Sequence, residues 1–278
     1  MPARFIRVYP PAQPTSSIAY WFPFRNDRVL VRETEQGVAP IQGHKEIQQL
    51  IPISYGHESS RMFIGTLDNI PCMTYESSIE TLPEGIRELT LREAYGQVDD
   101  VVFGIIVYAY QLLYWQRTSN FCPVCGHAPE GEEGTWGKRC PNCGHVAYPH
   151  VTPAILALVH DDDGNMLLTH KRGWGKRYSC VAGFTEPGES LEECVQREVL
   201  EELGVEVTDV TYVGSQPWPF PHQLMVGFTA RYMSGDIHIQ EQELDDAHWF
   251  SVKSPPEMPP SLSLAHTMIQ TWIERHTR

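Results

Sequence analysis

The pattern of apolar and polar residues changes character along the chain. Up to about residue 95, short strand-like runs such as 28–31 and 61–65 alternate with turns that carry Pro and Gly. Residues 91–117 predict one long helix rich in aromatic side chains. A compact island of Cys, Gly, Pro and polar residues follows. We predict a mixed α/β domain over 1–95, a linking helix over 96–120 and a small module over 121–148.

Beyond residue 149 the pattern predicts strands around a central helix. Two apolar runs of strand length, 154–159 and 166–168, flank Asp163-Gly164, a dipeptide typical of hairpin turns. Further elements are expected as a helix at 190–203, strands near 207–214 and 224–233, and a C-terminal helix over about 262–275. This order predicts an α+β or α/β sandwich over residues 149–278.

Composition and charge exclude several classes of protein. The 278 residues carry 21 Lys and Arg against 35 Asp and Glu, a net charge of −14, and 41% are hydrophobic. Such a composition is typical of a globular chain with a sizeable core, so a disordered or low-complexity protein is excluded. The acid excess argues against broad charge-driven binding to nucleic acid or to a membrane surface.

No segment predicts a membrane span or a secretory signal. The longest apolar-rich uncharged run, 101–116, is shorter than the roughly 20 residues that a span needs, so we interpret it as a buried or interface helix. The first seven residues lack the apolar region of a signal peptide. Four of the seven cysteines form CxxC pairs and three are scattered, which suits a reducing cytoplasm better than a disulfide framework. We expect a cytoplasmic protein with no membrane partner.

The cysteine island contains two matched motifs, Cys122-Pro-Val-Cys125-Gly-His and Cys140-Pro-Asn-Cys143-Gly-His. Two CxxC turns can direct four thiolates at one point, the tetrahedral geometry that structural zinc prefers. A redox role would need one motif in a thioredoxin-like βαβ setting, which is not seen. Because four cysteines leave no open position for a substrate, we predict structural Zn²⁺ that staples neighbouring domains. A free-standing ribbon that binds nucleic acid is the alternative.

The clearest chemistry lies on the predicted helix at 190–203. Ser190 and Glu193 have the spacing of a capping box, and Gly204 is a natural helix end. Apolar residues recur every four positions and form a stripe that can dock on a sheet, at Leu191, Val195, Val199 and Leu203.

Beside that stripe, Glu201 and Glu202 follow Glu198 by three and four positions, so all three carboxylates can converge on one face. A solvated acidic face is the plain alternative. Crowded carboxylates become favourable when a divalent cation neutralises them, and Mg²⁺ or Mn²⁺ prefers oxygen ligands and shares its shell with phosphates. The pattern therefore indicates a cation site.

These residues resemble the Nudix box of Nudix hydrolases, which cleave nucleoside diphosphates linked to another moiety. The matching residues are Gly183, Glu189, Arg197, Glu198, Val199, Glu201, Glu202, Gly204 and Val205. The resemblance implies an α/β/α sandwich for about residues 149–278. It implies metal binding by Glu198 and Glu202, help from Glu201 in binding metal or water, and a supporting ion pair of Glu189 and Arg197. The backbone carbonyl of Ala182 is often a further metal ligand in such enzymes.

A proline-rich aromatic segment follows at 215–225. Three prolines that alternate with two aromatic residues argue against a central strand, so we expect a stiff loop whose rings could stack on a base. A loop that only covers the core is the alternative. The segment resembles the SQPWPFP signature of the NADH pyrophosphatase branch of Nudix enzymes, which also has a four-cysteine ribbon and a long N-terminal domain. That branch usually has Ser where this chain has Gln223.

The resemblance implies further substrate-binding positions. Tyr148 and Phe184 would stack on the two faces of a nucleotide ring, and Ala265 would contact substrate through its backbone. Glu243 matches an additional metal-binding or catalytic carboxylate, although an ordinary loop carboxylate remains the alternative. The segment expected to line the substrate site comprises Gln216, Pro217, Trp218, Pro219, Phe220, Pro221, His222 and Gln223.

The resemblance as a whole implies a homodimeric, metal-dependent diphosphatase. It would hydrolyse NAD(H) to NMN(H) and AMP and remove NAD caps from RNA, which is the same bond cleavage. A Nudix enzyme for ADP-ribose or diadenosine polyphosphates would keep the box but lack the Trp218–Phe220 segment. A non-enzymatic zinc-ribbon RNA-binding protein would tolerate loss of the carboxylates and should have a basic face.

Overall fold

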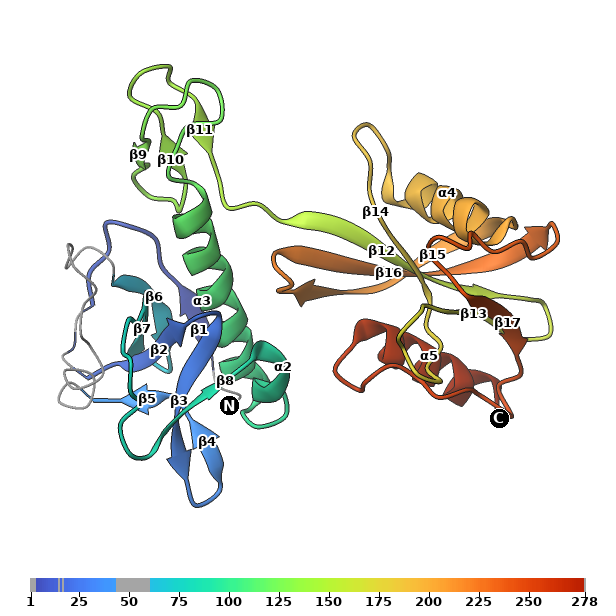
Figure 1. The fold of residues 1–278 in the computed structure, drawn as a ribbon, viewed down its shortest axis with the longest axis horizontal. Coiled ribbons are helices and arrows are strands. Elements are labelled where there is room, and N and C mark those ends of the chain that lie inside the picture. Colours follow the sequence, from blue (N-terminus) through green and yellow to red (C-terminus); the bar gives the residue numbers. More distant parts are fainter. Residues whose placement is uncertain (1–3, 15, 17, 44–60, 278) are drawn as a thin grey trace. The chain divides into compact units, whose positions relative to one another are not determined.

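The computed structural model describes residues 4–14, 16, 18–43 and 61–277, so residues 1–3 of the N-terminal stretch discussed above lie outside it. The chain divides into two compact units, Met1–His150 and Val151–Arg278 (Figure 1). Each unit has a sheet and a hydrophobic core of its own. No helix in the described ranges is both long and apolar enough to cross a bilayer.

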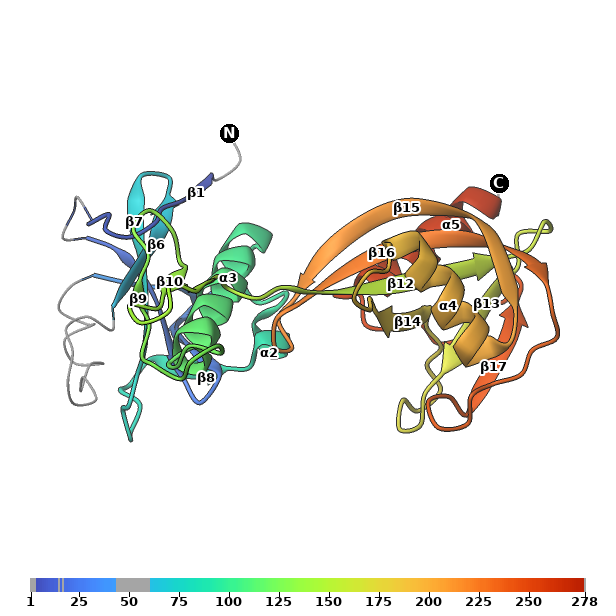
Figure 2. The same ribbon diagram turned by 90° about the horizontal axis from the view of Figure 1, so that it is seen from above.

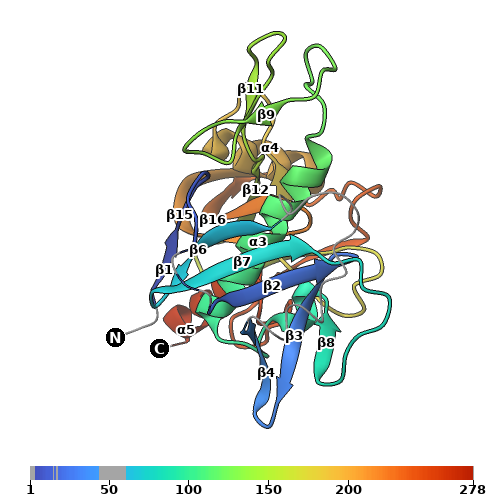
Figure 3. The ribbon, with the colours of Figure 1, turned by 90° about the vertical axis from the view of Figure 1, so that its left-hand side faces the viewer.

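The first unit is built on a mixed sheet with the strand order β1-β6-β7-β2-β3-β4 (Figure 3). In addition, β5 pairs with β2 and β8 pairs with β3. Strands β2 and β7 run parallel, and the other pairs are antiparallel. The strands are β1 (Phe5–Arg7), β2 (Tyr20–Arg25), β3 (Arg28–Thr34), β4 (Gly37–Ala39), β5 (Ile41–Gln42), β6 (Met62–Leu67), β7 (Ile70–Glu76) and β8 (Ile86–Leu89). The strands expected at 28–31 and 61–65 are confirmed.

The single helix predicted over 91–117 is wrong, because the structure has α2 (Leu91–Ala94) and α3 (Asp100–Thr118). Gly96 adopts a left-handed φ of +76° between them. The side chain of Asp99 then accepts a hydrogen bond from the first turn of α3, at 2.9 Å. A glycine and a new N-cap inside the apolar pattern end one helix and begin the next.

Helix α3 therefore starts four residues later than the linking helix predicted over 96–120. It packs on β2 and β7 of the first unit. Its buried side chains include Ile105, Ile106, Ala109 and Leu112, which confirms the interpretation of 101–116 as a buried helix.

The cysteine-rich module is a small sheet of β9 (Glu130–Gly131), β10 (Lys138–Arg139) and β11 (Val146–Ala147). Two tryptophans attach it to α3. The indole N–H of Trp115 donates to the carbonyl of Trp136 at 2.8 Å, and that of Trp136 donates to Tyr108 Oη at 2.8 Å.

The second unit has the strand order β15-β16-β12-β13-β17, with β14 on β12. Its elements are β12 (Thr152–His160), β13 (Met166–His170), β14 (Val181–Phe184), α4 (Leu191–Leu203), β15 (Glu206–Trp218), β16 (Gln223–Ser234), β17 (Asp246–Phe250) and α5 (Leu264–His276). Strands β12 and β13 pair across the predicted Asp163-Gly164 turn.

Helices α4 and α5 cover opposite faces of this sheet, as Figures 1 and 2 show. The apolar stripe of α4 packs into one core cluster with Ile155 and Phe228, and α5 packs into a second cluster with Leu158 and Met166. The predicted α/β/α sandwich, and an α+β chain with a mixed N-terminal domain, are confirmed.

The stiff loop predicted at 215–225 is wrong over most of its length. Residues up to Trp218 end β15, and Gln223 starts β16, so only 219–222 form a turn. Pro217 pairs with Leu224 within this hairpin. Because β15 lies at the edge of the sheet, Pro217 can lack an N–H there without breaking a central ladder.

Candidate functional site

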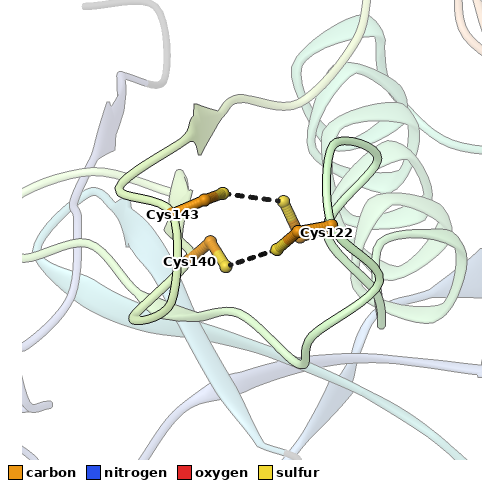
Figure 4. A group of neighbouring side chains, drawn as sticks. Cys122, Cys140 and Cys143 are labelled. Atoms are coloured by element: carbon orange, nitrogen blue, oxygen red, sulfur yellow. Dashed lines mark hydrogen bonds between the residues drawn. The ribbon is translucent and has the colours of Figure 1, made fainter.

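The four cysteines of the two matched motifs come together. Their Sγ atoms all lie within 4.8 Å of one another, with Cys122 and Cys143 3.6 Å apart and Cys125 and Cys140 3.4 Å apart. Figure 4 shows Cys122, Cys140 and Cys143 directed at one another. Each motif curls through a left-handed glycine whose N–H donates to the carbonyl of the first cysteine at 2.9 Å. The donor set and its spacing fit a structural zinc ion.

Helix α4 forms as its sequence predicts. Ser190 and Glu193 make the reciprocal hydrogen bonds of a capping box, and Gly204 ends the helix with φ +71°. The stripe of Val195, Val199 and Leu203 is fully buried, while Leu191 is partly buried against the same cluster. Docking of this stripe fixes which side of α4 carries the carboxylates.

Arg197 holds three of these carboxylates in place. Its Nε and Nη2 donate to the two oxygens of Glu189 at 2.7 and 2.9 Å. Its Nη1 donates to Glu198 at 2.8 Å and to Glu201 at 3.1 Å. Its hydrogen bonds lower the pKa of Glu189 to about 2. The ion pair of Glu189 and Arg197 is thus present, and it ties the loop before α4 to the helix.

The carboxylates of Glu198, Glu201 and Glu202 do not share one environment. The Glu202 side chain is 2% exposed, whereas that of Glu201 is 56% exposed and lies beside Arg197. Glu202 therefore lies in the buried part of the acidic cluster and Glu201 at its exposed edge, so the expected convergence of the three carboxylates is only partial. Glu198 is instead packed over the backbone, since a Cβ atom at Gly183 would lie 1.8 Å from its Cδ.

The ammonium group of Lys171 contacts both Glu202 and Glu243. Lys171 Nζ donates to Glu202 Oε1 at 3.2 Å and to Glu243 Oε2 at 3.4 Å. The other oxygen of Glu202 is buried and has no hydrogen-bond partner among the described residues. Lys171 was not among the residues predicted from the sequence, because its partners lie 31 and 72 residues away and no local pattern marks it.

Burial and mutual repulsion act on the carboxylates together. Burial raises the pKa of Glu198 despite Arg197, and Glu201 and Glu243 raise it further. Burial also raises the pKa of Glu202 despite Lys171, with added repulsion from Glu243 and Glu198. The negative charges of Glu198, Glu202 and Glu243 thus repel one another.

The acidic cluster has a surplus of negative charge. Five carboxylates, those of Glu189, Glu198, Glu201, Glu202 and Glu243, contact two cations, which leaves −5 + 2 = −3. The buried unpartnered oxygen of Glu202 and the packed carboxyl of Glu198 fit an oxygen-ligated divalent cation. Within the ranges described, only the cysteine set brings three or more ligand atoms within 4.8 Å of one another.

The predicted substrate residues come from both units of the chain. Tyr148 belongs to the first unit and Phe184 to the second, and both rings are exposed. Ala265 is buried in the first turn of α5. Ala182 lies in β14 opposite Leu156.

The hairpin residues make contacts within the second unit. Trp218 and Phe220 stack edge to face at 5.1 Å, and His222 Nδ1 lies 3.1 Å from the Thr152 hydroxyl. The Gln216 amide donates to the Leu262 carbonyl at 2.8 Å and accepts from the Leu264 N–H at 2.7 Å. Gln216 therefore binds the start of α5. Pro217, Pro219, Pro221 and Gln223 complete the hairpin.

Three family models match the chain. They are the NUDIX domain over residues 150–267, the NADH pyrophosphatase zinc ribbon domain over 117–148, and the NADH pyrophosphatase-like rudimentary NUDIX domain over 18–115. The sandwich with its acidic helix is therefore a NUDIX domain, and the cysteine module is a zinc ribbon.

Curated relatives named "NAD-capped RNA hydrolase NudC" are similar over most of the chain. That of Stutzerimonas stutzeri is 38% identical over 78% of this chain and 78% of its own length. The relative from Deinococcus radiodurans is 42% identical over 67% and 68%, and that from Pseudomonas syringae pv. tomato is 35% identical over 88% and 92%. The chain belongs to the NudC family of NUDIX hydrolases, which confirms the resemblance found in the sequence.

Proposed function

We propose that the chain is a metal-dependent diphosphatase that hydrolyses NAD(H) to NMN(H) and AMP. The same cleavage removes NAD caps from RNA and gives NMN and a 5′-monophosphate end. The observation that carries the proposal is the surplus of three negative charges around α4 of a NUDIX domain. The names of the curated relatives support the choice of substrate.

Glu198, Glu202, Glu243 and the Ala182 carbonyl are the groups proposed to hold the catalytic cation, Mg²⁺ or Mn²⁺. When bound, such a cation neutralises charge on the pyrophosphate and lowers the pKa of water at the site. The choice of Mg²⁺ or Mn²⁺ is supported by the all-oxygen set of donor groups. The ribbon cysteines are proposed to hold Zn²⁺ in a structural role.

The chain's own residues position this site. Arg197 clamps Glu198 through a 2.8 Å hydrogen bond, and Glu189 holds Arg197 through two more. Gly183 leaves the space in which the Glu198 carboxyl lies. Glu201, at the exposed side of the clamp, is proposed to orient the attacking water. Attack at the adenylyl phosphorus then gives AMP.

Substrate recognition is proposed to use exposed aromatic rings. The ring of Tyr148 in the first unit and that of Phe184 in the second are exposed, and each is proposed to stack on a nucleotide ring. The hairpin with Trp218 and Phe220 would line the site, and Gln216 would act through α5 because both ends of its amide are bonded there. We further propose a homodimer that works in the cytoplasm.

The test is mass spectrometry of the products from NADH, ADP-ribose and NAD-capped RNA, with Mg²⁺ or Mn²⁺ present. Hydrolysis of NADH in H₂¹⁸O should place the label in AMP, whereas label in NMNH would contradict attack at the adenylyl phosphorus. Comparable turnover of ADP-ribose would contradict the assignment to NAD(H).

Two variants separate chemistry from folding. Glu202→Gln removes a buried carboxylate of the cluster and should lower kcat for NADH and capped RNA by about 10²-fold or more. Glu192→Gln, at an exposed position on the first turn of the same helix, should keep the wild-type rate. Undiminished activity of Glu202→Gln would refute the proposed site.

A further inference from the structure

Lys171 contacts two carboxylates of the proposed cation site. Its ammonium lies 3.2 Å from Glu202 Oε1 and 3.4 Å from Glu243 Oε2. Glu202 comes from α4 and Glu243 from the segment before β17, so Lys171 bridges two separate parts of the second unit. The positive charge of Lys171 would repel a divalent cation that binds to the same two carboxylates.

The residue before Lys171 is held by three contacts. His170 pairs through Nδ1 with the Asp245 carboxylate, and its Nε2 lies 2.9 Å from the carbonyl of Gly175. The Asp245 N–H donates back to the His170 carbonyl at 3.1 Å. The backbone of Lys171 is thus anchored to the segment that carries Glu243, while its ammonium is at the end of a flexible four-carbon stem.

The contacts of Lys171 leave the acidic cluster incompletely neutralised. Glu202 is 2% exposed and keeps a buried oxygen without a hydrogen-bond partner in the described part of the chain. One ammonium carries a single charge, whereas Glu202 and Glu243 carry two. A divalent cation would match both carboxylates better, and it would release an ammonium that is already 25% exposed.

We propose that Lys171 competes with the catalytic divalent cation for Glu202 and Glu243 and, once displaced, binds a phosphate oxygen of the substrate. In the metal-free protein the ammonium compensates part of the buried acidic charge. In the loaded protein the same group lies beside the pyrophosphate, a dianion at neutral pH that ammonium groups bind as point charges. The inference rests on the proposed function for the identity of that substrate.

The first experiment measures Mn²⁺ binding without substrate, by the electron paramagnetic resonance of free Mn²⁺, on the full chain with its zinc. Lys171→Met should bind Mn²⁺ about tenfold tighter than wild type, because a competing charge within 4 Å of two carboxylates is gone. Lys176→Met removes the same charge from an exposed position five residues along and should leave Mn²⁺ affinity unchanged. Equal or weaker Mn²⁺ binding by Lys171→Met would overturn the competition.

The second experiment separates KM from kcat at saturating Mn²⁺. Lys171→Met should raise KM for NADH about tenfold, while Lys171→Arg, which keeps a cation, should recover most of the affinity. An unchanged KM in Lys171→Met would overturn the phosphate contact. Should Lys171→Met lose the wild-type melting transition, Lys171→Gln makes the same two comparisons. Tighter Mn²⁺ binding in a protein that does not hydrolyse NADH would refute the proposed function and leave the competition standing.

Discussion

Gly183→Ala should inactivate the enzyme without unfolding it. A Cβ atom at this position would lie 1.8, 2.0 and 2.3 Å from the three carboxyl atoms of Glu198. Cβ atoms essentially never approach other atoms closer than 3.0 Å, so the Glu198 carboxyl must move by about 1.2 Å or more. A misplacement of about 1 Å at a catalytic group can lower the rate about 10²-fold.

The fold should tolerate this change. The atoms that must move are the far end of a flexible side chain, and Gly183 is not among the glycines with a left-handed backbone. Replacing Gly by Ala in an allowed conformation changes the free energy of unfolding by less than about 1 kcal/mol. Loss of activity and loss of stability should therefore be separate in this variant.

The assay is the steady-state rate of NADH hydrolysis, measured beside urea unfolding of the same preparation. Gly214→Ala is the matched control, because its Cβ would meet only Leu264 Cδ1, at an ordinary 3.8 Å. It should keep both activity and stability. Full activity in Gly183→Ala, or a destabilisation large enough to explain its inactivity, would refute the reasoning.

Three further predictions follow from contacts described above. Arg197→Lys should lower kcat/KM by about ten- to a hundredfold, since an ammonium lacks the planar fork of donors that contacts Glu189, Glu198 and Glu201. A rate within twofold of wild type would contradict the positioning role of Arg197. The pKa of Glu189 is lowered from 4.5 to about 2 by Arg197, so its contribution to stability is present above pH 4.5 and is lost as the pH falls toward 2. The difference in melting temperature between wild type and Glu189→Gln should accordingly shrink over that range, and a constant difference would argue against the ion pair. Gln216→Leu should lower the free energy of unfolding, measured by urea denaturation, by about 1–2 kcal/mol, because the Leu264 N–H and the Leu262 carbonyl lose their partner. An unchanged free energy of unfolding would show that water replaces the amide.

The parts of the structure that were predictable from the sequence are those encoded by neighbouring residues. The caps of α4 and its apolar stripe repeat within one or two turns, and the cysteine motifs carry their own left-handed glycines. The signals for such structures lie within a few neighbouring residues, so they can be recognised before the rest of the fold is known.

The features that were missed depend on partners far along the chain. Lys171 meets Glu202 and Glu243 only once β13 and α4 have docked. Pro217 could not be assigned to a strand because its place at a sheet edge depends on the order of all the strands. The break before α3 was the exception, since Gly96 and Asp99 were visible locally but were outweighed by the long apolar pattern.

The amide of Gln216 has a consequence for anyone who wishes to change what this enzyme accepts. The hairpin that carries Trp218 and Phe220 is hydrogen-bonded through Gln216 to Leu262, just before α5, and to Leu264, its first residue. A hairpin transplanted from another NUDIX protein would find the same main-chain N–H and carbonyl waiting in this chain, but it could bond to both only if it brought a Gln at position 216. A graft that alters the rings at 218 and 220 should therefore keep this one amide, which sets the hairpin against the start of α5.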